Sequence, residues 1–483
     1  MEPKDEPEKT KPLAGGTVVA PDKRRKQLHG NRFVFTSAQN NTFIHEDFFA
    51  ALMNFCAHNE AQLVISPFTY NKSGFQNGTK DNEDLWYDPR LLPFFVKEST
   101  QITESLIFCG ELNILPTAVN PLSGFENYTQ SASGIVPHTK VQMRSLPRMK
   151  GEEPRFLYTT GAVTQRNYIP KKAGQKAEFH HVFGALYVEI DENGTWFARQ
   201  LVADEAGTFF DLTTEYTSTG VSSNHKAAAI TWGDIHIEKI DTQVAQAGWG
   251  DQGSMLTVLR PDFQFIHDLT DFRARNHHNI KDPYHLAEMH VEGHANVERD
   301  LQECGAFLQY ITRFGNTAVV VESNHDQALK RWLREADIRQ DPENAEFYHR
   351  ANMMIHQAIQ AKDKRFNVFE WAVSGDGLLD GPVVFLQEDD SFLVKNIEQG
   401  LHGHRGPNGS RGAINGFRTV GRKINIGHSH SAGIFDGVYV AGVSGLLDMD
   451  YNKGPSSWSH SHIVTYPNGK RTIITMKNGK WRA

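Results

Sequence analysis

ITWGDIH, at residues 230–236, is the stretch that decides the fold, because it is typical of a buried strand that ends in a carboxylate and an imidazole. The pattern recurs twice further along the chain. FQFI at 263–266 leads into HDLTD, and AVVVE at 318–322 leads into SNHD. In open α/β sheets, binding sites form where strand ends meet loops. We therefore expect three groups of polar side chains to converge at one point beside a sheet.

The composition is that of an ordinary globular protein. The chain has 483 residues, of which 39% are hydrophobic and 22% charged, and this length suits two or three domains. We find no apolar run long enough to span a membrane and no signal-peptide segment. The three scattered cysteines argue against disulfides and favour the cytoplasm. The 23 histidines are unusual in a chain of net charge −7, and imidazole is the commonest side-chain ligand of transition metals.

The first half of the chain predicts a tail followed by an α/β domain. Residues 1–27 are rich in Lys, Glu, Asp and Pro, and we expect them to be disordered. Residues 28–215 begin with strand, helix and strand patterns between 32 and 65, an order that predicts a parallel β-α-β unit. The stretch 111–154 is rich in Pro, Gly, Ser and Asn and predicts long loops. No catalytic constellation is evident in this half.

Residues 222–483 predict a second domain that contains the three polar strand ends. A helical stripe of apolar residues runs through 291–314, and a second helix is expected at 345–361. Further strands are expected at 383–386, 424–426 and 438–440, and a terminal hairpin at 459–481.

Five polar clusters follow one another along this second half. They are Asp234 with His236, Asp268 with Asp271, Asn324-His325-Asp326, His402 with His404, and His428 with His430. Singly, each is a weak signal, since a lone histidine is more often an ordinary core or surface residue. If the first strand continues through 234–236, its alternation places both polar side chains on one face. Taken together, carboxylate, amide and imidazole groups suit Mn²⁺, Fe²⁺ or Zn²⁺ better than Ca²⁺.

The ordered set of clusters resembles the signature of the calcineurin-like metallophosphoesterase superfamily. The resemblance covers the chain from Asp234 to His430 and implies an α/β metallophosphoesterase domain, with sheets flanked by helices and a metal site at the strand ends. Two positions depart from the superfamily pattern, because His267 and Ser323 stand where glycines are usual. Both lie beside the ligands, so they bear on backbone geometry more than on metal binding.

The resemblance implies two divalent metal ions, with Mn²⁺ expected and Fe²⁺ or Zn²⁺ as alternatives. The first ion would be held by Asp234, His236, Asp268 and His430. The second would be held by Asp268, Asn324, His402 and His428. Asp268 would therefore bridge the two ions. In the fourth of the five polar clusters, either His402 or His404 is the metal ligand, and we favour His402.

The resemblance also implies catalytic roles. A hydroxide that bridges the two metals would attack phosphorus in line. His325 would protonate the leaving alkoxide, Asp326 would orient that imidazole, and Asp271 would support the site from a neighbouring position.

Further histidines and arginines next to the motifs are candidates for substrate contact. His277 and His278 follow soon after Asp268, and their alternative interpretation is a histidine-rich helix start. The glycine-rich loop that follows His402 is a candidate for binding phosphate, because it contains arginines. Arginine binds phosphate oxygens through paired hydrogen bonds. Its alternative interpretation is a flexible surface loop. The candidates in this loop are His404, Arg405 and Arg411.

The superfamily contains phosphatases, nucleotidases and DNA nucleases, so the metal site alone does not choose a substrate. The Asn-His-Asp motif and the loop at 402–409 are similar to SbcD-like DNA nucleases and to a phage-encoded branch that degrades host DNA early in infection. This resemblance implies a homo-oligomeric, metal-dependent deoxyribonuclease that acts on DNA in the host cytoplasm, without a membrane partner. A phosphatase or nucleotidase is the alternative. A non-enzymatic DNA-binding module is disfavoured, because no ligand of the pattern is missing.

Overall fold

The three apolar runs form neighbouring parallel strands in the computed structural model, which describes residues 26–70, 85–276, 279–375, 379–449 and 451–483. β14 pairs with β15 and β15 pairs with β16, both in parallel register. β17 extends the sheet beyond β16, and the predicted terminal hairpin completes six strands on the other side. The strands of this sheet are β14 (Ala229–Thr231), β15 (Phe263–Ile266), β16 (Thr317–Val321), β17 (Val383–Leu386), β23 (Ser461–Thr465) and β24 (Arg471–Thr475).

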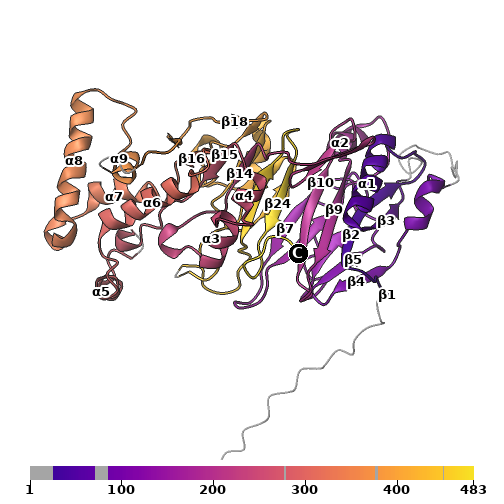
Figure 1. Cartoon of the computed structure of the whole chain (residues 1–483), viewed down its shortest axis with the longest axis horizontal. Helices are drawn as coiled ribbons and strands as arrows, with labels where there is room; N and C mark the ends of the chain where they lie inside the picture. Colours follow the sequence, from indigo (N-terminus) through magenta and orange to yellow (C-terminus); the bar gives the residue numbers. More distant parts are fainter. Residues whose placement is uncertain (1–25, 71–84, 277–278, 376–378, 450) are drawn as a thin grey trace, which may run out of the picture.

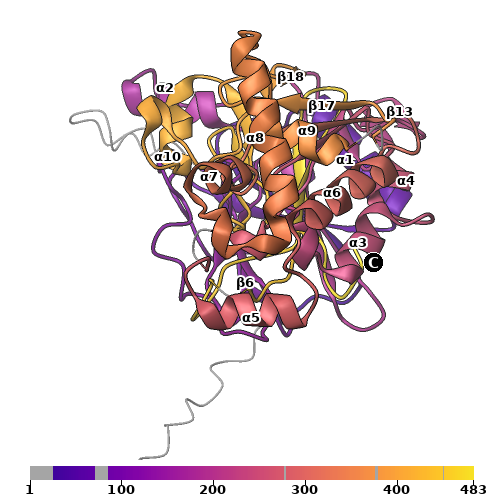
Figure 2. The same cartoon turned by 90° about the vertical axis from the view of Figure 1, so that its left-hand side faces the viewer.

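Helices pack on the six-stranded sheet and form a single hydrophobic core with it. The predicted apolar stripe lies in α6 (Val297–Ile311), and its side chains are buried. This helix is shorter than predicted because the Asn296 side chain caps its start by accepting a hydrogen bond from the Arg299 N–H. Figures 1 and 2 show α5 to α9 grouped at the end of the molecule away from β1 to β5. The other helices of this half are α3 (Thr242–Trp249), α4 (Met255–Leu259), α5 (Pro283–Val291), α7 (Ala328–Glu335), α8 (Ala345–Gln360), α9 (Val368–Ser374) and α10 (Ile414–Phe417).

The predicted β-α-β unit is confirmed near the start of the chain. β2 (Arg32–Gln39) and β3 (Gln62–Phe68) are parallel neighbours, and α1 (Glu46–Asn59) connects them. β9 (Gly184–Ile190) and β10 (Trp196–Val202) complete a four-stranded sheet in the order β10-β9-β2-β3. The apolar face of α1 packs on this sheet, since Phe48, Leu52 and Phe55 are buried in the same cluster as Val34 and Ile65.

An eleven-stranded sheet joins the two halves of the chain, in the order β1-β4-β5-β6-β8-β7-β21-β22-β20-β19-β18. β7 from the first half pairs antiparallel with β21 from the second. The expectation of loops throughout 111–154 is wrong for β6 and β7, because four-residue strands are too short to show hydrophobic periodicity among turn residues. The strands are β1 (Lys26–Gln27), β4 (Ser99–Thr103), β5 (Leu106–Cys109), β6 (Ser133–Val136), β7 (Met143–Leu146), β8 (Arg155–Thr159), β18 (Leu393–Val394), β19 (Ile397–Glu398), β20 (Lys423–Ile426), β21 (Gly433–Phe435) and β22 (Val438–Val440).

A second connection runs between the four-stranded and six-stranded sheets. Oε1 of Gln200 in β10 accepts a hydrogen bond from the backbone N–H of Ile473 in β24. The backbone N–H of Gln200 donates to the Thr472 hydroxyl. Side chains of these two sheets and of the eleven-stranded sheet pack together in one hydrophobic cluster. The division into domains at 215–222 stays a prediction, as does the tail at 1–27, most of which lies outside the described residues. The remaining elements are α2 (Lys172–His180), β11 (Phe209–Asp211), β12 (Thr214–Thr217) and β13 (Gly220–Ser222).

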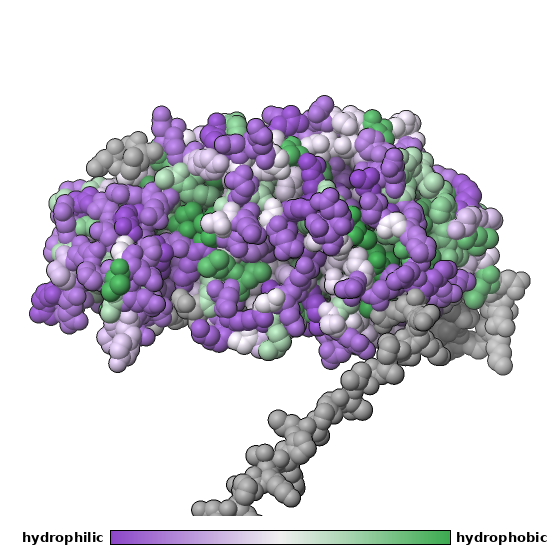
Figure 3. Space-filling model, turned by 60° about the horizontal axis from the view of Figure 1, so that its bottom comes forward, coloured by the Kyte–Doolittle hydropathy of each residue, from purple (hydrophilic) through white to green (hydrophobic). Residues whose placement is uncertain are grey.

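The molecule is therefore a mixed α/β protein with several sheets flanked by helices, in agreement with the predicted fold class. Figure 3 shows one face, on which hydrophilic residues predominate and hydrophobic ones occur in several separate groups. No helix in the described part of the chain has the length and hydrophobicity that crossing a bilayer requires.

Arg199 in β10 is a test of how strongly the first half depends on a buried charge. Its guanidinium is 3% exposed, donates two hydrogen bonds of 2.7 and 2.9 Å to Asp211, and also binds Glu189. Arg199→Ala leaves two carboxylates without their cation, so we expect the free energy of unfolding to fall by about 3–5 kcal/mol. Urea denaturation measures this. Arg331→Ala, which removes an exposed partner of Glu335 on α7, is the control and should change stability little.

Candidate metal centre

The loops that follow β14, β15 and β16 lie side by side and carry the first three motifs. β14 ends at Thr231, so Asp234 and His236 do not alternate along a strand as predicted. Instead the backbone N–H of His236 donates to the Asp268 carbonyl at 2.8 Å, which fixes the first loop against the second. His236 and Asp268 both have left-handed backbone conformations, with φ of 48° and 42°. Strained conformations of this kind persist where the surrounding structure fixes them, most often at functional sites.

A first group of potential ligands brings together three motifs. Its ligand atoms all lie within 4.8 Å of one another, and its four residues, Asp234, His236, Asp268 and His430, are all buried. His430 Nε2 lies 3.0 Å from Asp234 Oδ2 and 3.2 Å from His236 Nε2. These four residues are the predicted ligands of the first ion.

A second group shares Asp268 with the first. It contains Asp268, His402 and His428, again with ligand atoms within 4.8 Å of one another. His402 Nε2 lies 3.3 Å from Asp268 Oδ2 and 3.0 Å from Asn324 Oδ1, so the amide belongs to the same cluster. His404 has a different environment, since its Nε2 lies 3.5 Å from Glu388 Oε1. The geometry therefore places His402, rather than His404, beside Asp268.

The residues of the centre fit a divalent cation. Asp234 Oδ1 and Asp268 Oδ2 are buried and accept no hydrogen bond from any residue in the described ranges. A buried carboxylate is costly unless a cation or hydrogen bonds compensate its charge. Although burial lowers the pKa of His402, the charge of Asp268 raises it to about 9. A bound cation would supply that compensation, and the mixed donor set suits Mn²⁺, Fe²⁺ or Zn²⁺.

Asp271 and His325 form the adjoining part of the site, and together with His236 they make a third group whose ligand atoms lie within 4.8 Å of one another. Asp271 lies 3.2 Å from His236 Nδ1 and 3.0 Å from Lys239 Nζ, and these groups hold the pKa of its carboxyl well below the usual value despite burial. His325 Nδ1 lies 3.2 Å from the Asp271 carbonyl oxygen. Burial lowers the pKa of His325, but the charges of Asp268 and Asp271 outweigh it and raise the pKa. The surroundings of the His325 ring, at the edge of the centre, therefore favour its protonated form.

Asp326 has partners that differ from the predicted one. Its Oδ1 accepts a hydrogen bond from the Thr270 N–H at 3.2 Å, and its Oδ2 accepts one from the Ser323 hydroxyl at 2.7 Å. It thus ties the second loop to the third, whereas Asp271 contacts the His325 ring. Burial and the charge of Asp268 raise the pKa of Asp326 to about 7.

Several residues of the site were not anticipated as contributors. His267 and Ser323, which replace the usual glycines, contact the ligand framework: His267 Nδ1 lies 3.3 Å from His402 Nδ1, and Ser323 donates to Asp326. Glu238 accepts hydrogen bonds from the backbone of Asp271 and Phe272. An acid two residues after a motif histidine is the only sequence signal for it. Tyr451, whose hydroxyl lies 3.4 Å from Asp271 Oδ1, carries no such signal.

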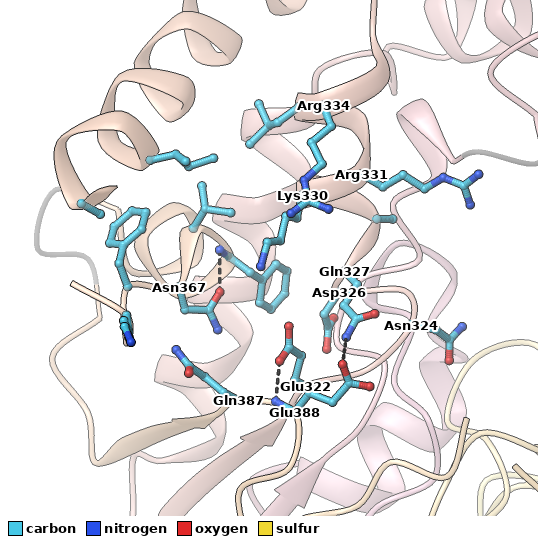
Figure 4. A pocket seen from close by; sticks show the side chains of 18 of the residues that line it. Glu322, Asn324, Asp326, Gln327, Lys330, Arg331, Arg334, Asn367, Gln387 and Glu388 are labelled. Carbon is cyan, nitrogen blue, oxygen red and sulfur yellow. Dashed lines mark hydrogen bonds between the residues drawn. The ribbon is translucent and has the colours of Figure 1, made fainter. Parts of the chain in front are cut away.

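A cleft of about 1120 Å³ extends from the centre toward α7, α8 and α9. Asn324, Asp326 and His428 line it on the side of the centre. Figure 4 shows Lys330 extending from α7 toward the side of the cleft that Glu322 and Glu388 occupy. Of the predicted substrate contacts, His404 and Arg405 line the cleft. Arg405 Nε lies 2.8 Å from Glu388. The exposed Arg411 forms an isolated antiparallel β-bridge with Arg405 through the backbone of their loop. His277 and His278 lie outside the described residues.

Gly427 allows the loop before His428 to approach Asp234. A Cβ at this position would overlap Asp234 Oδ1, whose own position is fixed by the backbone N–H of His428 donating to Oδ2 at 2.7 Å. We expect Gly427→Ala to displace the carboxylate and to weaken Mn²⁺ binding by about 10–100-fold, which isothermal titration calorimetry measures. Gly220→Ala is the control, because its Cβ would enter open space. Equal Mn²⁺ affinity in both variants would contradict a role for Asp234 as a ligand.

Comparison with known proteins gives one informative result. No family model and no solved structure matches the chain. Protein A1 of Escherichia phage T5 is 44% identical to it over 484 residues, an alignment that spans 98% of this chain and 86% of the phage protein. With this identity over nearly its whole length, the chain belongs to the family of the phage T5 protein A1.

Proposed function

We propose that this protein is a two-metal phosphodiesterase that hydrolyses DNA. The observation that carries the proposal is the position of Asp268, which belongs to the group around Asp234 and also to the group around His402 and His428. Enzymes that hydrolyse phosphodiesters with two metals hold the ions about 3.5–4 Å apart, and a carboxylate shared between them suits that distance. In this proposal Asp234, His236 and His430 complete one coordination sphere. Asn324, His402 and His428 complete the other.

The chemistry follows from the residues around Asp268. When bound, the two cations would neutralise phosphate oxygens and lower the pKa of water at the centre. His236 would bind through Nε2 while Asp271 holds its Nδ1, an arrangement that fixes the ring and raises its basicity. His325 has Nδ1 against the Asp271 carbonyl, which leaves Nε2 to donate a proton to the leaving oxygen. Its side chain is 13% exposed, so substrate can reach it.

The substrate class rests on the cleft and on the relative. The cleft is large, and one of its walls carries Lys330, Arg331 and Arg334, which are able to contact phosphates, while Glu322, Glu388 and Asp389 line it elsewhere. Sheets flanked by helices, with the centre at the strand ends, agree with what the calcineurin-like metallophosphoesterase resemblance implies. Similarity to a phage protein supports action in the cytoplasm of an infected cell.

The alternative is a phosphatase or nucleotidase with the same centre, and substrate assays separate the two. Purified protein is incubated with Mn²⁺ and either linear double-stranded DNA, single-stranded DNA or mononucleotides. We expect acid-soluble fragments from DNA and none after chelation with EDTA. Phosphate release from mononucleotides with DNA left intact would contradict the nuclease proposal and favour the alternative. Comparison of linear with circular DNA then distinguishes exonuclease from endonuclease action.

A further inference from the structure

A second cavity, of about 790 Å³, is strongly basic although the chain as a whole is acidic. It lies where α2, the segment around α10 and the strands β20 and β22 meet, and Figure 2 shows α2 and α10 next to each other. Glu205 and Asp436 are its acidic lining residues. Its lysines and arginines are Lys140, Arg166, Arg418, Arg422, Lys423, Lys470 and Arg471.

A smaller hollow of about 500 Å³ shares lining residues with the basic cavity and with the surroundings of the metal centre. Its lining includes Gly427 and His428 from the loop of the fifth cluster, and also Asn415 and Ile434. Asn415 and Ile434 also line the basic cavity, and His428 also lines the large cleft. The hollow therefore shares walls with the cleft and with the basic cavity.

Most cations of the basic cavity already have partners. Asp436 is contacted by Lys140 at 3.8 Å and by Arg418. Arg166 pairs with Glu205 at 2.8 Å. Arg471 donates to the carbonyl oxygens of Ile424 and Gly437 and stacks on Tyr439. These contacts hold the walls of the cavity in place.

Lys423 and Lys470 are different, because neither forms an ion pair with any residue that the structure describes. Burial lowers the pKa of Lys423, and the charge of Arg471 lowers it further. Burial also lowers the pKa of Lys470, followed by the charge of Lys423. The charges of Glu205 and Asp204 oppose this effect at Lys470, and the Lys423 side chain is exposed. Two ammonium groups without an ion pair thus line a cavity in which cations outnumber carboxylates, an arrangement that a bound anion would stabilise.

We propose that the basic cavity is a second phosphate-binding site, in which Lys423 and Lys470 contact the phosphodiester backbone of the DNA strand whose reacting phosphate lies at the metal centre. The proposal rests on the proposed function. Lysine binds phosphate as a point charge without reading sequence, so the contact would position the strand whatever its bases. In this proposal the strand would run over the hollow, whose lining includes both His428 and residues of the basic cavity.

The test is the salt dependence of DNA binding, measured with the full-length protein in EDTA so that no cleavage occurs. Fluorescence anisotropy with a labelled single-stranded oligonucleotide gives the slope of log K against log salt concentration. Each phosphate contact to a single strand contributes about 0.7 to that slope, so K423Q/K470Q should reduce its magnitude by about 1.4 and weaken binding at least tenfold. Lys97→Gln combined with Lys226→Gln, two exposed lysines outside the cavities, is the charge-matched control and should keep the wild-type slope.

Two further measurements make the result decisive. The charge reversal K423E/K470E should weaken binding more than K423Q/K470Q, and circular dichroism verifies that both variants fold. Equal slopes for wild type and K423Q/K470Q overturn the proposal. Weaker binding of inorganic phosphate with an unchanged oligonucleotide slope also overturns it, because the cavity would then bind a free anion.

Failure of this proposal and failure of the proposed function are distinguishable. If the wild-type protein degrades DNA but the slope does not change in K423Q/K470Q, only the second site is wrong. If the slope changes but the protein cleaves no DNA with any divalent metal, the second site stands as a DNA contact and the nuclease function is wrong.

Discussion

Asp268→Asn is expected to abolish metal binding and to lower the rate of DNA cleavage by at least about 10³-fold. Among the described residues, Asp268 is the carboxylate shared by the group around Asp234 and the group around His402, and its Oδ2 is buried without a hydrogen bond from those residues. Asparagine has the same size as aspartate. It also keeps an oxygen that can accept the hydrogen bond which the backbone N–H of His325 donates to Asp268 Oδ1 at 3.3 Å. The loss should therefore come from the missing charge rather than from misfolding.

Two measurements check this expectation. Metal analysis of the purified protein gives the number of ions bound per chain, and initial rates on linear DNA give the activity. Asp251→Asn removes an exposed carboxylate that pairs with Arg313, and it should leave both quantities unchanged. An Asp268→Asn protein with the metal content and the rate of the wild type would refute the shared-carboxylate centre.

His325→Asn should lower the rate of DNA cleavage by about 10²–10⁴-fold, the usual contribution of a general acid, while the number of bound metals stays the same. The ring lies beside the two groups of ligands and contacts Asp271 through Nδ1. The loss should be much smaller with bis(p-nitrophenyl) phosphate, because p-nitrophenolate is a stable anion that leaves without a proton. This difference between substrates separates proton donation from a structural role.

The matched control is His356→Asn, an exposed histidine on α8 away from the centre, which should not change either rate. Equal losses on DNA and on the nitrophenyl ester would show that His325 does not donate the proton. A lower metal content in His325→Asn would instead assign the ring to metal binding.

The sequence was sufficient to predict the strands around the centre because their burial has a simple cause. β14, β15 and β16 are parallel neighbours inside a mixed sheet that is covered on both faces, so each appears as a short continuous apolar run. The polar residues that follow each run had to lie at the same edge of the sheet. That argument brought together Asp234, Asp268 and Asn324 without any knowledge of the loops.

The contacts between the loops could not be predicted in the same way. Asp326 is next to His325 in the chain but binds Thr270 and Ser323, because the direction of a side chain in a loop depends on backbone angles that have no periodicity. Tyr451 reaches Asp271 from a distant segment, and nothing in the sequence links the two. Likewise β6 and β7 are too short to give a strand pattern.

The pairing of β7 with β21 limits how the protein can be divided into fragments. A fragment that begins at residue 222 would keep every candidate ligand but would lose the neighbour of β21, leaving that strand with a row of unsatisfied amide and carbonyl groups. Exposed strand edges of this kind recruit other chains and promote aggregation. A fragment that contains only the half with the candidate metal centre would need new residues along the edge of β21, so truncation and domain exchange are poor routes to engineering this protein.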